Sequence, residues 1–139
     1  MRVLALDVGD KRTGVALSDS MGMIATPLTT IHAGDEDELA TAVVALIAEH
    51  GAGEVVVGMP LTLAGEMGSQ AKRTGHFVRL LKGLTALPVK TVDERLSTVE
   101  ATRRMREAGT RRKKARENID AAAAAVVLQA YLDSGGGRG

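Results

Sequence analysis

The order of apolar runs along the chain is the feature that most constrains its fold. Residues 2–7 form a short aliphatic run and residues 13–18 form another, while residues 9–12 between them have the composition of a hairpin loop. The two runs are therefore predicted to pair as antiparallel strands. Residues 25–31 are expected to add a third strand, which Pro27 confines to a sheet edge or a bulge because proline donates no ladder hydrogen bond.

The next element is predicted to be a helix that begins after Asp35 and ends at Gly51. Asp35 followed by Glu38 is typical of a capping box, and a glycine suits the left-handed turn that closes a helix. Apolar residues recur between these ends at helical spacing, at Leu39, Val43, Leu46 and Ile47. These four side chains are expected to face the core.

Strand and helix patterns then alternate. Residues 54–57 and 89–92 are predicted strands, and residues 69–83 between them are a predicted helix. Its inward face is expected to present Phe77, Leu80, Leu81 and Leu84. Strand, helix and strand in this order imply parallel pairing through right-handed crossovers. The fold class is therefore α/β, with an antiparallel meander and parallel strands in one mixed sheet flanked by helices.

Two more helices are predicted near the C-terminus. Residues 97–108 begin with a capping box and stop at Gly109, and residues 118–132 include five consecutive alanines that allow close approach to a sheet. The chain of 139 residues fits one domain, expected over residues 1–133. Residues 134–139 are rich in glycine and are predicted to be a disordered tail.

The composition limits the class of site. The chain contains no cysteine, which excludes disulfides and thiolate metal sites and leaves oxygen ligands, which suit hard cations. The three histidines, His32, His50 and His76, have no ligand spacing and are expected to be structural or surface residues. No apolar run approaches the roughly 20 residues of a membrane span, so we expect a cytoplasmic protein with no membrane partner.

Positive charge is concentrated in one part of the chain. Residues 72–116 contain 14 Lys and Arg against four acids, although the formal net charge of the whole chain is only +1. Such a segment can be a solvated face, but crowded like charges destabilise a compact protein unless an anion binds. Nucleic acid is the expected partner.

Three positions place a carboxylate at the end of a predicted element. Asp7 ends the first strand, Asp93 and Glu94 end the last strand, and Asp120 is expected in the first turn of the last helix, where the helix dipole favours an ionised carboxylate. Ligands gather beyond the carboxyl ends of parallel strands, so these acids are expected to converge at one sheet edge. Crowded carboxylates repel one another unless a divalent cation binds.

Each acid also has a structural interpretation. Asp7 could be a turn former before Gly9, Asp120 could be a helix cap or dipole partner, and Glu94 could pair with Arg95 or Arg12. For any one acid the two interpretations are about equally weighted. The coincidence of three acids with a basic segment favours a metal-dependent phosphodiesterase site.

Five segments of the chain match a known pattern in the right order. They are Asp7-Val8-Gly9-Asp10-Lys11-Arg12-Thr13-Gly14-Val15-Ala16, Val57-Gly58-Met59-Pro60-Leu61, Val92-Asp93-Glu94-Arg95-Leu96-Ser97-Thr98, Arg112-Lys113-Lys114 and Ile119-Asp120-Ala121-Ala122-Ala123. From Met1 to about Asp133 the chain resembles the YqgF family, which is associated with Holliday-junction resolution and with 5′-end maturation of precursor 16S rRNA. Thr13 and Met59 depart from the commoner residues of the family, and neither is an acid.

The resemblance implies an RNase H-like fold with a mixed five-stranded sheet, and hydrolysis of phosphodiester bonds at a site with two Mg²⁺ or Mn²⁺ ions. By motif, Asp7, Glu94 and Asp120 correspond to the catalytic and metal-binding acids, with Asp7 bridging the ions and Asp93 as the reserve ligand. Nucleic-acid contacts are expected from nine residues: Lys11, Arg12, Gly58, Pro60, Arg95, Arg111, Arg112, Lys113 and Lys114. With one Phe, one Tyr and no Trp, recognition is expected to depend on shape and charge rather than on base stacking.

Alternatives remain open at the level of sequence. Asp-x-Gly before a glycine hairpin also resembles the first phosphate loop of actin-like ATPases, but 139 residues cannot supply the second lobe those enzymes need. A non-catalytic RNA-binding module for ribosome assembly would use the same basic surface. The physiological substrate is either precursor rRNA or a branched DNA junction, and the protein is either a monomer or a homodimer.

Overall fold

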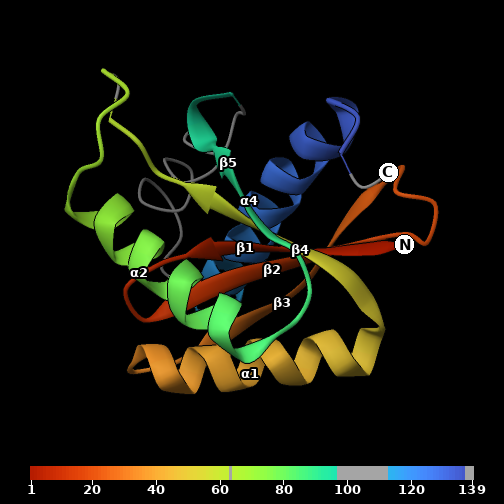
Figure 1. The fold of residues 1–139 in the computed structure, drawn as a ribbon, viewed down its shortest axis with the longest axis horizontal. Helices are drawn as coiled ribbons and strands as arrows, with labels where there is room; N and C mark the ends of the chain where they lie inside the picture. The colour runs from red at the N-terminus through yellow and green to blue at the C-terminus, as the bar shows by residue number, and fades with distance from the viewer. Residues whose placement is uncertain (63, 97–112, 137–139) are drawn as a thin grey trace.

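The computed structural model describes residues 1–62, 64–96 and 113–136 (Figure 1). The elements follow the order β1 (Arg2–Val8), β2 (Arg12–Ser18), β3 (Ala25–His32), α1 (Glu36–His50), β4 (Ala52–Met59), α2 (Ser69–Leu84), β5 (Val89–Asp93), the short 3₁₀ helix η1 (Glu94–Leu96) and α4 (Lys113–Asp133). The helix predicted over residues 97–108, with its stop at Gly109, lies outside the described residues.

The strands form one five-stranded sheet in the order β3-β2-β1-β4-β5. The pairs β1–β2 and β2–β3 are antiparallel, whereas β1–β4 and β4–β5 are parallel, which confirms the predicted mixed α/β sheet. Strand β3 is an edge strand, and its register with β2 shifts so that Val15 pairs with Thr29 and Ala16 with Pro27. The prediction made from this proline, an edge position or a bulge, is confirmed.

Helix α1 has the predicted ends. The side chain of Asp35 accepts a hydrogen bond from the Glu38 backbone N–H at 2.8 Å, and Glu38 Oε2 accepts one from the Gly34 N–H at 3.1 Å. Gly51 adopts the left-handed conformation, with φ of 63°, and its N–H donates to the Ile47 carbonyl. These local bonds satisfy backbone groups that a helix end would otherwise leave unpaired.

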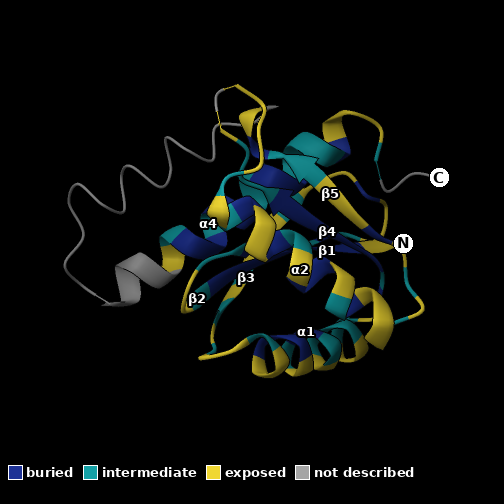
Figure 2. Ribbon diagram, turned by 60° about the vertical axis from the view of Figure 1, so that its left-hand side comes forward, coloured by how far each residue is buried: buried dark blue, intermediate teal, exposed yellow. Residues whose placement is uncertain are grey.

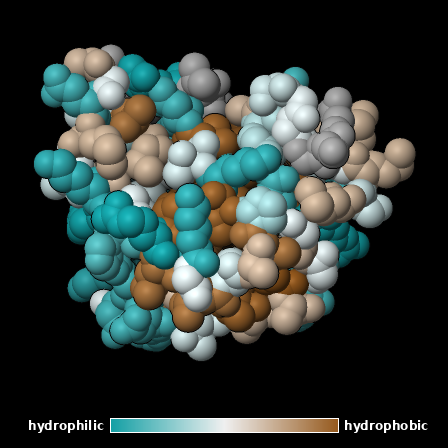
Figure 3. Space-filling model, in the orientation of Figure 1, coloured by the Kyte–Doolittle hydropathy of each residue, from teal (hydrophilic) through white to brown (hydrophobic). Residues whose placement is uncertain are grey.

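Helix α2 differs from its prediction at one position. Phe77 and Leu81 are buried as expected and Leu80 is half-buried, but Leu84 is 54% exposed. Leu84 is the last residue of the helix, where the chain turns toward β5. At this position the helix no longer packs against the sheet, so the side chain is exposed. Figure 3 shows apolar surface near the middle of the side of the molecule that carries α2.

Helix α4 begins earlier than predicted, at Lys113 rather than at residue 118. Lys, Ala, Arg and Glu at positions 113–117 all have high helix propensity, and no glycine or proline separates them from Asn118. Asp120 therefore lies in the third turn of the helix, not in the first. The prediction that the helix dipole stabilises its carboxylate is wrong, because that effect fades beyond the first turn.

The two faces of the sheet have separate cores. On one face, Leu4, Leu6, Val15, Val55 and Val57 pack against α1 and α2. On the other face, Val3, Ala5, Ala16 and Val56 pack against Ala124, Leu128 and Leu132 of α4. The sheet is thus the middle of three layers, with buried residues running through it (Figure 2).

The described chain ends in a turn after α4. The Ser134 N–H donates to the Ala130 carbonyl at 3.2 Å, and the Gly136 N–H donates to the Tyr131 carbonyl at 3.0 Å. Residues 137–139 of the predicted tail lie outside the described residues. Among the helices that are described, none combines the length and apolar content that a membrane span requires.

Candidate metal and nucleic-acid site

Asp7 lies on the α4 face of the sheet near the carboxyl end of β1. Side chains alternate along a strand, so Asp7 shares the face of Val3 and Ala5, and it is only 5% exposed. Asp7 pairs across the antiparallel ladder with Gly14. On its other side Leu6 pairs with Val57, so the next residue of β4, beside Asp7, is Gly58. Two residues without side chains therefore flank this carboxylate.

Glu94 occupies the space that Gly58 leaves. A Cβ atom on Gly58 would lie 2.7 Å from Glu94 Oε1 and 3.1 Å from its Cγ, and Glu94 is 6% exposed. Gly58 pairs with Val92 of β5, two residues before Glu94, so Glu94 continues the face that Gly58 shares. Gly58 thus leaves room for this second carboxylate. The predicted contact of Gly58 with nucleic acid stays a prediction.

Asp93 has a different environment from Glu94. Arg95 donates to it from its backbone N–H at 2.9 Å and from Nη2 at 2.6 Å. The side-chain hydrogen bonds from Arg95 are the main cause that lowers the pKa of Asp93. Arg95, one of the two partners considered for Glu94, thus forms an ion pair with Asp93. Of the two acids at this strand end, Glu94 is the one buried on the α4 face.

Asp120 reaches the same end of the sheet from α4. A Cβ atom on Gly14 would overlap the backbone carbonyl of Asp120, so the helix backbone touches β2 directly opposite Asp7. Asp120 is 2% exposed, and Arg12 Nε lies 3.2 Å from its Oδ2. Asp120 is therefore neither a helix cap nor a first-turn residue.

The structure thus brings Asp7, Glu94 and Asp120 to one end and one face of the sheet, all of them buried. Three carboxylates without cysteine or histidine form a donor set that fits a hard divalent cation. In residues 1–62, 64–96 and 113–136, however, no group of three Asp, Glu or His side chains is arranged to hold a metal ion. The residue types fit such an ion, and its binding by these three acids stays a prediction.

The basic residues predicted to contact nucleic acid differ in their surroundings. Lys11 is exposed at the β1–β2 turn, Arg12 pairs with Asp120, and Arg95 pairs with Asp93. Pro60 is half-buried just after β4. Lys113 and Lys114 begin α4, and Arg111 and Arg112 lie outside the described residues. Direct contact of these residues with nucleic acid stays a prediction.

The sequence did not predict a second polar cluster on the α4 face. Buried Glu54 accepts a hydrogen bond from the Tyr131 hydroxyl of α4, and Lys90 Nζ lies 3.3 Å from both the Glu54 carboxylate and the Tyr131 oxygen. Burial raises the pKa of Tyr131, and hydrogen bonding to Tyr131 and Glu54 raises the pKa of Lys90. A glutamate inside the aliphatic run of β4 is the one sequence signal that could have indicated this cluster.

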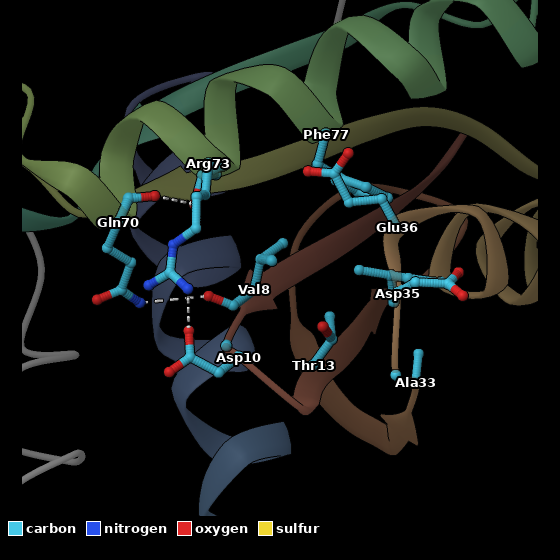
Figure 4. Close-up of a pocket in the computed structure, with 13 residues that line it drawn as sticks. Val8, Asp10, Thr13, Ala33, Asp35, Glu36, Gln70, Arg73 and Phe77 are labelled. Atoms are coloured by element: carbon cyan, nitrogen blue, oxygen red, sulfur yellow. Dashed lines mark hydrogen bonds and ion pairs between the residues drawn. The ribbon is translucent and has the colours of Figure 1, made fainter.

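A pocket of about 160 Å³ lies on the opposite face of the sheet, between the β1–β2 turn and the first turns of α1 and α2 (Figure 4). Val8 and Phe77 line it, and Gln70 and Arg73 extend from α2 toward the turn. Arg73 Nη1 lies 2.6 Å from Asp10 Oδ1. Because the pocket is on the α1 and α2 face, it is separate from the three carboxylates.

Comparison with known proteins gives close relatives over nearly the full length. Proteins named "Putative pre-16S rRNA nuclease" are similar to this chain in several bacteria. The protein from Chloroflexus aurantiacus is 44% identical over 132 residues, which cover 95% of this chain and 86% of the relative. The proteins from Desulforamulus reducens and Moorella thermoacetica are each 43% identical, covering 97% and 100% of this chain and 98% and 99% of the relatives.

A solved structure of similar fold is Thermus thermophilus RuvC in complex with a Holliday junction substrate. The TM-score is 0.61 at 13% sequence identity, and the match covers 99% of this chain and 97% of that protein. A second structure of T. thermophilus RuvC gives a TM-score of 0.60 at 14% identity, covering 97% of both chains. At this level of identity the likeness concerns the fold alone, and it confirms the RNase H-like architecture.

A family model that matches nearly the whole chain shows the family. The sequence model of the RuvX family, described as Holliday junction resolvase, matches residues 1–134. Residues 1–134 include Asp7, Glu94 and Asp120 and the glycines that flank Asp7. The chain therefore belongs to the RuvX (YqgF) family.

Proposed function

We propose that this chain is a metal-dependent endonuclease that hydrolyses phosphodiester bonds during 5′-end maturation of precursor 16S rRNA. The observation that supports it most strongly is the burial of Asp7, Glu94 and Asp120 on one face at one end of the sheet. Buried acids are uncommon unless a partner compensates their charge, and neighbouring carboxylates repel one another unless a cation binds. The names of relatives more than 40% identical over nearly the full length support the choice of rRNA.

Asp7, Glu94 and Asp120 are the residues that would hold the cation. Asp7 is the central ligand of the three. It lies on β1 between β2, which contacts Asp120, and β4, which contacts Glu94. Bound Mg²⁺ or Mn²⁺, two ions in the proposed site, supplies a lowered water pKa and neutralises negative charge on the phosphate. The rigid strand and helix positions of the acids fix where that charge acts.

The remaining residues of the site bind and position the polymer. Lys11 and Arg12 lie at the β1–β2 turn next to the acids, and their cationic groups attract the phosphate backbone. In the reaction, water adds to phosphorus, the bond from phosphorus to the 3′ oxygen breaks, and a proton passes to that oxygen. The products have a 5′-phosphate and a 3′-hydroxyl. Affinity for nucleic acid is expected to fall steeply as salt rises.

A second candidate substrate is the four-way DNA junction. The observation that favours it is the description of the matching family as Holliday junction resolvase. A third candidate, a non-catalytic RNA-binding module, would retain the basic residues without needing buried acids. The three candidates are separated by cleavage, since the third predicts none and the first two predict different products.

The test is cleavage of a precursor 16S rRNA fragment and a four-way DNA junction by the purified protein, side by side with Mn²⁺ or with a chelator. We expect Mn²⁺-dependent cleavage that is faster on the rRNA fragment. Glu94→Gln should lower the rate at least about a hundredfold. Glu49→Gln, the same chemical change on exposed α1, is the matched control and should retain the wild-type rate. Faster cleavage of the junction than of the rRNA fragment would identify DNA as the substrate. Absence of cleavage of both substrates would favour the non-catalytic RNA-binding module.

A further inference from the structure

The ion pair between Arg12 and Asp120 joins a predicted phosphate contact to a predicted metal ligand. Arg12 Nε lies 3.2 Å from Asp120 Oδ2, and the two side chains are 26% and 2% exposed. The sequence placed these residues in two separate roles, with Arg12 on the substrate and Asp120 on the cation. In the structure they contact each other.

Asp120 needs a positive charge close to it. A carboxylate that is 2% exposed has lost most of its hydration, and in the third turn of α4 it is beyond the reach of the helix dipole. A buried charge of this kind is strongly destabilising unless a partner compensates it. Among the described residues, Arg12 lies at ion-pair distance from this carboxylate.

Arg12 has a fixed backbone and an accessible side chain. The Gly9 N–H donates to the Arg12 carbonyl at 3.0 Å, and a Cβ atom on Gly9 would lie 2.5 Å from that oxygen, so the turn holds the backbone in place. The guanidinium group is at the surface end of a flexible chain and can turn toward solvent. One group can therefore reach either the buried acid or an anion outside it.

We propose that Arg12 is an exchangeable counter-ion of Asp120. With no divalent cation bound, the Arg12 guanidinium compensates the buried carboxylate. A divalent cation that binds Asp120 replaces that charge, and Arg12 moves to a phosphate of the nucleic acid. The proposal rests on the proposed function for the identity of the cation and the polymer, and it concerns the regulation of the same site.

The exchange makes the two ligands cooperative. A cation that takes Asp120 releases Arg12 for phosphate, and a phosphate that takes Arg12 leaves Asp120 available to the cation. By thermodynamic linkage each ligand then tightens the binding of the other by the same factor, commonly about 5-fold to 150-fold. A permanent Arg12–Asp120 pair would give no such coupling.

The first test is the affinity of the metal-free protein for Mn²⁺ alone, measured by titration calorimetry or by the loss of the free-ion electron paramagnetic resonance signal. Arg12→Gln removes the competitor, so we expect Mn²⁺ to bind at least about fivefold tighter than to the wild type. Arg79→Gln makes the same chemical change at an exposed residue of α2, on the other face of the sheet, and it should change the affinity less than about twofold. Mn²⁺ affinity no higher in Arg12→Gln than in Arg79→Gln would overturn the proposal.

Arg12→Gln leaves a buried carboxylate without its cation, so a second variant keeps the proposal testable if that protein does not fold. Asp120→Asn releases Arg12 while removing the charge that needs it. In a chelator, this variant should bind the same rRNA fragment at least about fivefold tighter than the wild type. Metal-free binding no tighter than that of the wild type would overturn the proposal.

A double-mutant cycle separates the release of Arg12 from the simple loss of one negative charge. The gain from Asp120→Asn should disappear when it is combined with Arg12→Gln and persist when it is combined with Arg79→Gln. A gain that survives Arg12→Gln would assign the effect to overall charge and refute the exchange. These binding measurements require no turnover, so failure of the exchange is distinguishable from failure of the nuclease proposal, which wild-type cleavage decides.

Discussion

The two faces of the sheet differ in the size and polarity of what they bury. The α1 and α2 face packs leucine, valine and the single phenylalanine, Phe77, into an apolar core. The α4 face packs valines and leucines between alanines and glycines, and it contains every buried acid of the described residues: Asp7, Glu54, Glu94 and Asp120. The α1 and α2 face has the large apolar side chains of an ordinary core. On the α4 face the side chains are small enough for the α4 backbone to contact β2 directly.

This difference suggests that one face of the sheet mainly stabilises the fold and the other mainly positions the site. Large side chains on the α1 and α2 face keep the strands together through apolar burial. Small side chains on the α4 face let buried polar groups sit at defined positions, at some loss of apolar area. Mutations on the first face should therefore change stability, and mutations on the second face should change activity by more than their effect on stability explains.

The largest stability effect is expected from Phe77→Ala. Phe77 is 1% exposed between α2 and the sheet, and truncation of a buried phenylalanine costs about 3–5 kcal/mol. Denaturant unfolding measures the loss, and cleavage per folded molecule should stay near the wild-type value. A fall in activity at a temperature where the variant is fully folded would break the proposed separation of the two faces.

Gly14→Ala is the corresponding change on the α4 face. The new methyl group would overlap the Asp120 carbonyl, so α4 must shift, and overpacking of this kind costs about 1–3 kcal/mol. Because the shift moves Asp120, cleavage per folded molecule should also fall. Gly83→Ala is the matched control, since nothing lies within 4 Å of its Cβ position in α2, and it should leave activity unchanged. Equal activity in both variants would contradict the contact between α4 and β2.

Gly58→Ala should separate stability from activity most clearly. Its methyl group would meet Glu94 Oε1, the end of a flexible side chain, which can swing away at little cost. We expect a stability change within about 1 kcal/mol and a clear loss of cleavage, because a shift of about 1 Å in a positioning group can cost about a hundredfold. Retained cleavage would show that Glu94 does not need its present place over β4.

The smallest effect on stability is expected from alkaline pH. It acts on Glu54, Tyr131 and Lys90, at the end of the α4 face away from the three site acids. Burial raises the folded pKa of Tyr131, and hydrogen bonds to Tyr131 and Glu54 raise that of Lys90. Groups with raised folded pKa values stabilise fully below their unfolded values, about pH 10, and lose this contribution as pH rises through the folded values. Tyr131 is the single tyrosine of a chain without tryptophan, so its phenolate absorbance reports the titration directly. Ionisation at the ordinary value would contradict the Glu54–Tyr131–Lys90 cluster.

Much of the fold could be predicted because its signals are local. The capping pair Asp35 and Glu38, the stop at Gly51 and the edge position of Pro27 each depend on residues a few positions apart, and the structure confirms them. The start of α4 could not be placed, because an apolar stripe marks only the buried part of a helix. The exposure of Leu84 depends on where the chain leaves α2, which helical periodicity does not encode.

The site was predictable in part for the same reason. Val3, Ala5 and Asp7 alternate along one strand, so the face of the carboxylate follows from the sequence once the strand is known. The pairing of Arg12 with Asp120 joins two distant parts of the chain and requires Gly14 between β2 and α4. No local pattern encodes that contact, and Gly14 itself was recognised only as part of a motif.

Asp7→Asn tests the proposed active site most directly, with cleavage, nucleic-acid binding and thermal unfolding measured on the same protein. The substitution keeps the size of the side chain and removes the charge of the central carboxylate, which is 5% exposed on the α4 face. We expect Mn²⁺-dependent cleavage to be lost, while binding of the rRNA fragment and the unfolding temperature stay close to those of the wild type. Undiminished cleavage by this variant would contradict the assignment of the active site to the three carboxylates.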